Sequence, residues 1–305
     1  MKNTKRRLAA LVAPLVALSL LATGCGSDTG DGDGDKAAGS DKSVNLGIIP
    51  SWTDGLSTAY LWKHVLEEEG YDVEITELSE AAPLYTGLAK GSVDVYPSAW
   101  PEVTHASYMD KYGDDLTDLG AYYDNAKLTL AVPAYSKLNS IEDLKGKGGD
   151  YDGRIVGIEP GAGLTKAVQE NVIPQYELDD EYKLVTSSTT AMLAELKKAV
   201  DAEKDLVVTL WRPFWANSTF EVKDLEDPKG ALGEPEGLHE MANKEWAEAN
   251  PEVVEMMGRL KLDDAQYGEL EDLVVNKFGA GKEEDAVEAF LDKHPEVLEM
   301  VTGTE

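Results

Sequence analysis

Cysteine and histidine are scarce in this chain of 305 residues, with one and four copies respectively. The single cysteine, Cys25, rules out a disulfide within the chain. His64, His239 and His294 show no spacing typical of metal ligands, so we predict no metal site. The catalytic motifs Gly-x-Ser-x-Gly and His-Glu-x-x-His are also missing. We therefore expect a protein that is not an enzyme, with no catalytic residues and no cofactor.

The chain also has few positively charged residues relative to its acidic ones. The chain has 28 lysines and arginines against 58 aspartates and glutamates, a formal net charge of −30. Nucleic acid binding depends on neutralising phosphates with basic side chains, so a nucleic acid partner is excluded. Most of the acidic residues are expected on solvated helix faces, as in Glu67–Glu69 and Glu283–Asp285.

Long hydrophobic runs are absent after the N-terminus. Leu8–Leu21 is apolar, but a membrane span needs about 20 residues. Positively charged residues precede the run, and Leu21-Ala22-Thr23-Gly24-Cys25 follows it. This segment resembles a bacterial lipoprotein signal, in which the cysteine becomes the lipidated first residue of the mature chain. We predict a signal peptide over 1–24, lipidation of Cys25 and an extracytoplasmic, membrane-anchored protein. An ordinary secretory signal is the alternative.

Residues 25–43 are rich in Gly, Asp and Ser, and they contain almost no apolar side chain. Such a segment cannot bury enough surface to fold, so we predict a flexible acidic tether. The chain from about Val44 to Gly303 is long enough for a large core, and two lobes are expected at this length.

Hydrophobic periodicity predicts alternating strands and helices from residue 44 onward. The β-α-β-α-β order at the start predicts a parallel sheet with helices on both faces. A strand over 127–132 is expected to cross between the lobes, and the pattern from Leu238 onward is helical. The predicted strands are 44–49, 72–78, 93–96, 127–132, 154–158, 182–186 and 206–210. The predicted helices before residue 238 are 56–69, 82–90, a short helix that starts over 140–144 with Ser140 as N-cap, 164–175 and 190–203.

Three tryptophans, Trp52, Trp100 and Trp211, lie at the ends of three different predicted strands. Strand ends in open α/β sheets are where ligands bind. Indole faces are the best side-chain partners for a quaternary ammonium, which has no N–H to donate. Because all three tryptophans lie at strand ends, the sequence favours an aromatic box for a methylated ammonium. The alternative is that all three indoles belong to the core.

A glycine-rich turn, Pro160-Gly161-Ala162-Gly163-Leu164, joins a predicted strand to a predicted helix. The free backbone N–H groups at such a helix start can bind an anion, either a carboxylate or a phosphate. The turn is neither a P-loop nor a dinucleotide-binding fingerprint, and a plain tight turn is the alternative. His105 follows Trp100 by five residues, and a helix starting at Pro101 would bring it near the same cleft.

Several ordered blocks resemble the glycine-betaine-binding subunit of bacterial osmoprotectant ABC importers. They include Ser51–Asp54, Thr104-His105, Gly157–Gly163 and Val207–Trp215, and the resemblance runs from Val44 to about Leu298. It implies a two-lobed α/β, type II periplasmic-binding-protein fold with the ligand between the lobes. By this resemblance, one lobe comprises 44–129 plus 220–305 and the other comprises 130–219.

The resemblance also implies roles for single residues. Trp52, Trp100 and Trp211 would surround a trimethylammonium group by cation–π contact, and His105 with the N–H groups of Gly163 and Leu164 would hold the carboxylate of a zwitterion. The implied function is to capture glycine betaine for osmoprotection and deliver it to an ABC permease for transmembrane transport.

Two blocks depart from the family pattern: Pro101-Glu102 replaces the usual Leu-Pro, and Phe214 replaces the usual His. Receptors for choline, ectoine or proline betaine remain open as alternatives. A secreted hydrolase and a structural lipoprotein are the alternatives from other classes.

Overall fold

The computed structural model describes residues 42–304. The predicted signal peptide, the lipidation site Cys25 and nearly all of the predicted tether lie outside these residues. Among the described helices, none combines the length and the apolar character that a membrane crossing requires. The folded residues form one compact unit within Ser40–Glu305.

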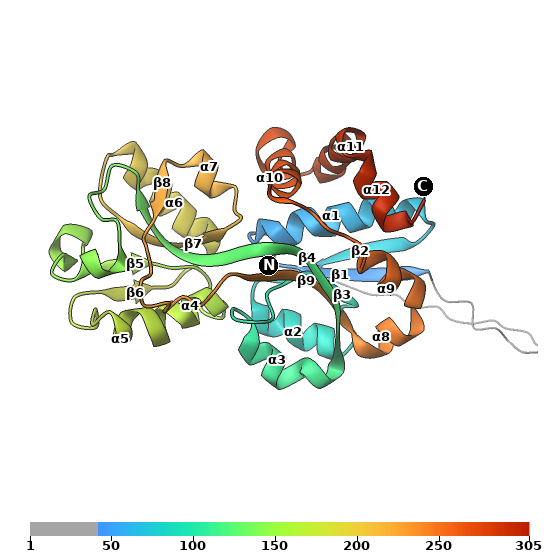
Figure 1. The fold of residues 1–305 in the computed structure, drawn as a ribbon, viewed down its shortest axis with the longest axis horizontal. Helices are drawn as coiled ribbons and strands as arrows, with labels where there is room; N and C mark the ends of the chain where they lie inside the picture. Colours follow the sequence, from blue (N-terminus) through green and yellow to red (C-terminus); the bar gives the residue numbers. More distant parts are fainter. Residues whose placement is uncertain (1–41, 305) are drawn as a thin grey trace, which may run out of the picture. The chain divides into compact units, whose positions relative to one another are not determined.

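A nine-stranded mixed sheet organises this unit, in the order β2-β1-β3-β9-β4-β7-β5-β6, with β8 paired to β4. We call β1, β2, β3 and β9 with their helices the first half, and β5, β6, β7 and β8 with theirs the second half (Figure 1). The strands are β1 (Ser43–Ile48), β2 (Asp72–Glu77), β3 (Val95–Ala99), β4 (Leu116–Pro133), β5 (Arg154–Val156), β6 (Lys183–Val185), β7 (Val207–Arg212), β8 (Val222–Asp224) and β9 (Glu236–Asn243).

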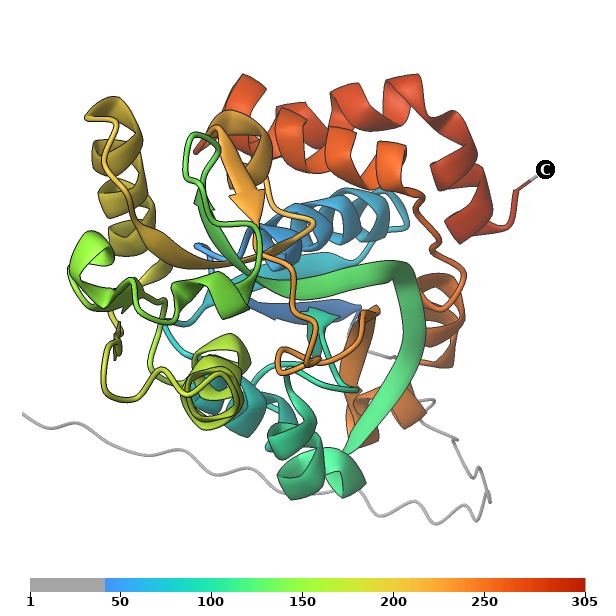
Figure 2. The ribbon, with the colours of Figure 1, turned by 60° about the vertical axis from the view of Figure 1, so that its left-hand side comes forward.

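Strand β4 belongs to both halves. Its first part pairs with β9 from Leu116 to Ala126, and its second part pairs with β7 from Lys127 to Ala131. The strand predicted at 127–132 is therefore the second part of a strand of 18 residues, which is the long, bent green strand in Figure 2. One continuous strand thus pairs with β9 of the first half and with β7 of the second half, and so joins the two halves.

The parallel sheet predicted from the β-α-β-α-β order is confirmed for that unit, because β1 pairs parallel with both β2 and β3. The sheet as a whole is mixed, because β9 runs antiparallel to both β3 and β4. One prediction about this region was wrong: the helical pattern does not begin at Leu238, since residues 236–243 form β9. The physical reason is that this strand buries two glutamates, Glu236 and Glu240. Their carboxylates accept hydrogen bonds from Thr104 and Trp62, so the strand reads as polar in sequence although it is central in the sheet.

Helices cover both faces of the sheet. Helix α1 packs with α10 and α11 on one face of the first half, and α2 and α3 lie on the other (Figure 1). Predicted and observed helices agree to within a few residues before residue 204, and the Ser188 side chain caps α6 by accepting the Ala191 N–H. The helices are α1 (Thr53–Glu68), α2 (Ala81–Ala89), α3 (Ala106–Tyr112), α4 (Gly163–Ala167), α5 (Ile173–Gln175), α6 (Thr189–Asp201), α7 (Ala216–Thr219), α8 (Lys244–Ala249), α9 (Pro251–Met257), α10 (Asp264–Asp272), α11 (Glu283–Lys293) and α12 (Pro295–Thr302).

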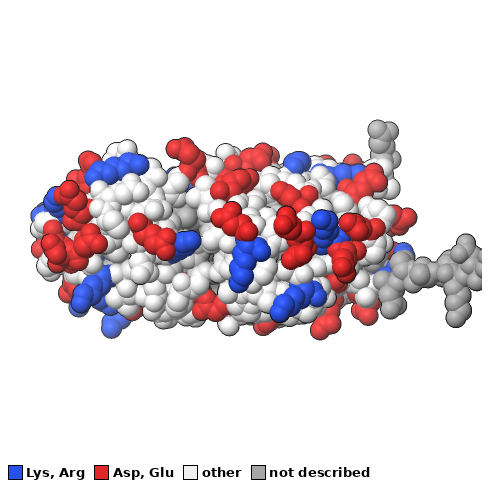
Figure 3. All heavy atoms as spheres, turned by 90° about the horizontal axis from the view of Figure 1, so that it is seen from below, with Lys and Arg blue, Asp and Glu red and all other residues white. Residues whose placement is uncertain are grey.

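The charge distribution agrees with the composition. On the face shown in Figure 3, acidic side chains are spread over the whole length with basic side chains between them. That face carries no basic cluster of the kind that binds a phosphate backbone.

Candidate functional site

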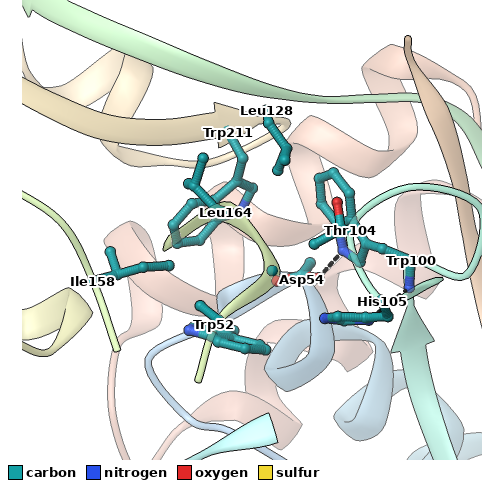
Figure 4. A pocket seen from close by; sticks show the side chains of 11 residues that line it. Trp52, Asp54, Trp100, Thr104, His105, Leu128, Ile158, Leu164 and Trp211 are labelled. Atoms are coloured by element: carbon teal, nitrogen blue, oxygen red, sulfur yellow. Dashed lines mark hydrogen bonds between the residues drawn. The ribbon is translucent and has the colours of Figure 1, made fainter. Parts of the chain in front are cut away.

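A small cavity lies between the two halves. All six residues predicted for the site line it, and they come from both halves (Figure 4). The full lining is Trp52, Asp54, Trp100, Thr104, His105, Leu128, Ile158, Ala162, Gly163, Leu164 and Trp211. The structure thus brings together residues that are far apart in sequence.

The strand ends place the three tryptophans. Trp52 follows β1 and is the N-cap residue of α1, and Trp100 directly follows β3. Trp211 lies inside β7, as its next-to-last residue, and pairs with Leu128 on β4. The three side chains are 8%, 5% and 5% exposed, in the same order. They are therefore largely buried, as the core alternative expected, but they are buried around a cavity.

Buried carboxylates hold two of the three indoles by their ring N–H groups. Trp52 Nε1 donates to Glu159 Oε2 at 3.1 Å, and Trp100 Nε1 donates to Asp54 Oδ2 at 3.0 Å. An indole has no other polar atom, so its face stays free for a ligand.

The third indole is held by stacking. Trp211 packs against Phe214 with ring centroids 4.0 Å apart and planes inclined by 23°. Phe214 is one of the two departures from the family pattern. In this structure it supports Trp211 from one side, while the cavity lies against the indole.

The loop that leads to His105 is well anchored. No helix starts at Pro101, although His105 still lies at the cavity. Residues 101–105 form turns, and α3 begins at Ala106 with His105 as its N-cap. Glu102 contacts His239 Nε2 at 2.9 Å, and Glu236 accepts the N–H groups of Val103 and Thr104 at 2.9 Å each. The Pro101-Glu102 departure therefore leaves His105 at the cavity.

The surroundings of His105 determine its protonation. The N–H of Trp100 donates to Nδ1 at 3.1 Å, and the hydroxyl of Tyr85 lies 2.9 Å from the same nitrogen. Nδ1 is thus an acceptor, and the proton of the neutral ring must sit on Nε2. Burial lowers the pKa of His105 to about 3. The ring is a neutral N–H donor, and Nε2 lies on the side away from the Trp100 backbone (Figure 4).

The glycine turn supplies further donors. Gly163 and Leu164 begin α4, whose N-cap residue Ala162 provides no side-chain cap. Among the described residues, no acceptor is found for the backbone N–H groups of Gly163 and Leu164. A Cβ on Gly163 would lie 1.9 Å from the carbonyl oxygen of Thr104, which belongs to the first half. Glycine is therefore required for this close approach of the two halves.

Five lining residues were not predicted: Asp54, Thr104, Leu128, Ile158 and Ala162. Three of them, Asp54, Thr104 and Ala162, lie within two residues of a predicted site residue, so the strand-end loops already pointed to their positions. Ile158 lies five residues before Gly163, in the Gly157–Gly163 block. Leu128 comes from the middle of β4, and no local signal marks it. Burial raises the pKa of Asp54, although hydrogen bonds from Ser98 and Trp100 favour its charged form.

Comparisons with known proteins agree on one family. The profile of the OpuAC family, described as the substrate binding domain of ABC-type glycine betaine transport systems, matches residues 42–293. The glycine betaine/carnitine transport binding protein GbuC of Listeria monocytogenes is 40% identical over 104 residues, which is 34% of either protein. The chain thus aligns with about a third of that relative's length.

Two solved structures resemble the whole folded unit. One is the glycine betaine/L-proline-binding protein ProX of Borrelia burgdorferi, with a TM-score of 0.78 and 29% identity over 85% of this chain and 96% of the other. The other is lactococcal OpuAC, closed around glycine betaine, with a TM-score of 0.77 and 29% identity over 86% and 100%. These likenesses confirm the predicted α/β fold of type II periplasmic binding proteins.

Proposed function

The chain belongs to the OpuAC family of substrate binding domains of ABC-type glycine betaine transport systems, and from this premise we propose that it captures glycine betaine outside the cytoplasm and delivers it to an ABC permease. The observation that carries the proposal is a single cavity with three indoles and three N–H donors. The two sets suit the two ends of a small zwitterion that carries a methylated ammonium and a carboxylate.

The ammonium end would be bound by Trp52, Trp100 and Trp211. A methylated nitrogen has no N–H, so an ion pair would lack the hydrogen bonds that strengthen such pairs, whereas aromatic faces attract the charge directly. Each desolvated face contributes about 1–2 kcal/mol. The buried carboxyl of Asp54 lines the same cavity, and in its charged form it adds attraction for a cation.

The carboxylate end would be held by His105 Nε2–H and by the N–H groups of Gly163 and Leu164. These donors belong to different halves, since His105 precedes α3 and Gly163 begins α4. A ligand that bridges them stabilises the closed arrangement over an open one, because only the closed arrangement offers all the contacts. The lobe bounds proposed from the sequence are 44–129 plus 220–305 for one lobe and 130–219 for the other. They differ from the two halves defined above at β8 (Val222–Asp224), which pairs with Ala131–Pro133 of β4 and lies in the second half.

A calorimetric titration against glycine betaine, proline betaine, ectoine and choline tests this proposal. Choline carries a hydroxyl in place of the carboxylate, so it leaves the three donors poorly paired, at a cost of about 1–3 kcal/mol. We expect glycine betaine to bind at least tenfold more tightly than choline. Equal affinities would favour the choline alternative. No heat and no thermal shift with any of the four solutes would favour a structural lipoprotein.

The attachment of the protein to the cell membrane is a further proposal. The N-terminal segment 1–24 is proposed to be a lipoprotein signal peptide, and Cys25 is proposed to carry the lipid that anchors the protein to the cell membrane. The acidic segment 25–43 would then serve as the tether between the anchor and the receptor.

A further inference from the structure

The carboxylate of Glu159 lies where the two halves meet, at the N–H edge of the Trp52 indole. It follows β5 in the second half and is 4% exposed. From the first half it accepts the Ser51 hydroxyl at 3.3 Å on Oε1 and the Trp52 indole N–H at 3.1 Å on Oε2. From its own half it accepts the Thr189 N–H at 2.9 Å on Oε1 and the Thr189 hydroxyl at 2.8 Å on Oε2.

The two pairs of hydrogen bonds differ in whether they depend on closure of the two halves. Thr189 is the first residue of α6, in the same half as Glu159, so it holds the carboxylate whether the halves are together or apart. Ser51 and Trp52 lie at the end of β1 in the other half. Their bonds to Glu159 exist only while the halves are closed. The carboxylate is therefore already positioned by its own half before it meets the indole.

We propose that Glu159 is a closure latch that sets the orientation of Trp52, so that the indole takes its ligand-binding position only when the two halves come together. This inference rests on the proposed function in one respect, namely that Trp52 contacts the ligand. In this view Glu159 is a positioning residue, because it does not line the cavity itself. Closure and formation of the aromatic box become one event.

The other indole–carboxylate pairs in the structure behave differently and serve as a reference. Trp100 and Asp54 both belong to the first half, so their bond survives any separation of the halves. Trp62 on α1 donates to Glu240 on β9 at 3.1 Å, also within the first half and away from the cavity. The Trp62–Glu240 pair matches Trp52–Glu159 in chemistry, in distance and in burial, but it does not cross between halves.

The substitution Glu159→Gln tests the latch. The side-chain amide keeps the shape but offers one acceptor oxygen and one NH₂ donor, while all four partners of Glu159 donate. The NH₂ must face a donor, so closure is penalised. We expect Glu159→Gln to weaken glycine betaine binding roughly tenfold, mainly through faster release in stopped-flow tryptophan fluorescence. Glu240→Gln, the matched control, should lower the melting temperature and leave release unchanged within about twofold.

A double-mutant cycle separates the latch from a merely structural role. Trp52→Phe keeps an aromatic face but lacks the N–H, so in that background Glu159→Gln should cost much less than it does alone. Purely additive losses, or a release rate in Glu159→Gln equal to that of the wild type, would overturn the latch.

Small-angle scattering of the ligand-free protein gives a readout that does not depend on glycine betaine. Glu159→Gln should increase the radius of gyration relative to the wild type and to Glu240→Gln. If the wild type fails to bind glycine betaine, the proposed function falls, and this comparison alone decides the latch. An unchanged radius of gyration would then reject it.

Discussion

The indoles of the cavity show how single residues are prepared for a cation. The ring N–H groups of Trp52 and Trp100 are taken up by buried carboxylates, and Trp211 is backed by Phe214. Each ring is thus fixed by an edge or by one face, and the remaining surface meets the cavity. Fixing the rings in advance lowers the entropic cost of binding.

Removing one face should weaken binding without unfolding the protein. We expect Trp100→Ala or Trp211→Ala to weaken glycine betaine binding at least tenfold, equivalent to about 1.4 kcal/mol, because one cation–π partner is lost. Calorimetry gives the affinity, and circular dichroism checks the fold. Trp246→Ala on α8, which lies outside the cavity lining, is the control and should bind normally. Unchanged affinity in both box variants would refute the aromatic box.

The role of His105 can be isolated by comparing two ligands. If its Nε2–H binds a carboxylate, His105→Ala should weaken glycine betaine markedly and choline very little, since choline has no anion to lose a partner. Calorimetric titration of both ligands into both proteins gives the four affinities. Equal losses for the two ligands would assign His105 to the structure of the loop instead of the carboxylate site.

Prediction from the sequence was most successful for single residues of the site. The three tryptophans could be found because each follows or ends a strand with clear periodicity. The tautomer of His105 could not be predicted, because it depends on the Trp100 N–H and the Tyr85 hydroxyl meeting at one nitrogen. Asp54 belongs to the same sequence block as Trp52, but nothing in the sequence showed that its carboxyl faces the Trp100 indole.

At the scale of elements, α10 contributes a buried acid to the packing around α1. Glu271 on α10 accepts a hydrogen bond from Thr53, the first residue of α1. Burial raises the pKa of Glu271 to about 8, and the nearby charges of Asp54 and Asp272 also raise it, while hydrogen bonds from Thr53 and the Trp215 backbone oppose the shift. The side chain is therefore protonated in the folded protein near neutral pH.

This raised pKa predicts a specific pH dependence of stability. Between about pH 4.5 and pH 8 the folded state holds a proton on Glu271 that the unfolded state has released, so rising pH destabilises the fold by up to about 1.4 kcal/mol per pH unit. Glu271→Gln mimics the protonated form and should remove this term. The measurement is the difference in unfolding free energy between the two proteins at pH 5, 6, 7 and 8. Parallel curves would show that Glu271 does not titrate in this range.

Elements were predictable where local signals agreed. Helix α6 has a strong period and the Ser188 cap, and its start was predicted within one residue. The prediction missed strand β9 because its buried residues include the polar Glu236 and Glu240. The helical stretch that begins at Lys244 also dominates the sequence pattern there. Burial of a charge is decided by partners elsewhere in the fold, which periodicity cannot report.

At the scale of the whole molecule, the closed arrangement depends on Gly163. A methyl group there would collide with the Thr104 carbonyl oxygen, so Gly163→Ala should hold the halves apart. We expect at least a tenfold loss of glycine betaine affinity and a larger radius of gyration. Gly149→Ala, whose added Cβ would meet nothing within 4 Å, is the control. Normal affinity in Gly163→Ala would show that the contact is not needed for binding.

The proposed anchor makes a separate prediction. Cys25→Ala should release the protein from the membrane while solute affinity stays the same, because the tether separates the anchor from the receptor. Fractionation after a carbonate wash, followed by calorimetry on the released protein, gives both quantities. Retention in the membrane fraction would contradict the lipid anchor.

The position of β9 also constrains how the chain acquires its structure. This strand lies between β3 and β4, yet β4 ends at Pro133 and β9 begins only at Glu236. Pairing across so long a connection carries a large loop-closure cost and slows folding. While Glu236–Asn243 have not yet been synthesised, the nascent chain exposes the unpaired edges of β3 and β4. The first half therefore cannot be completed until most of the polypeptide has been synthesised, and fragments that end before Glu236 should aggregate instead of folding.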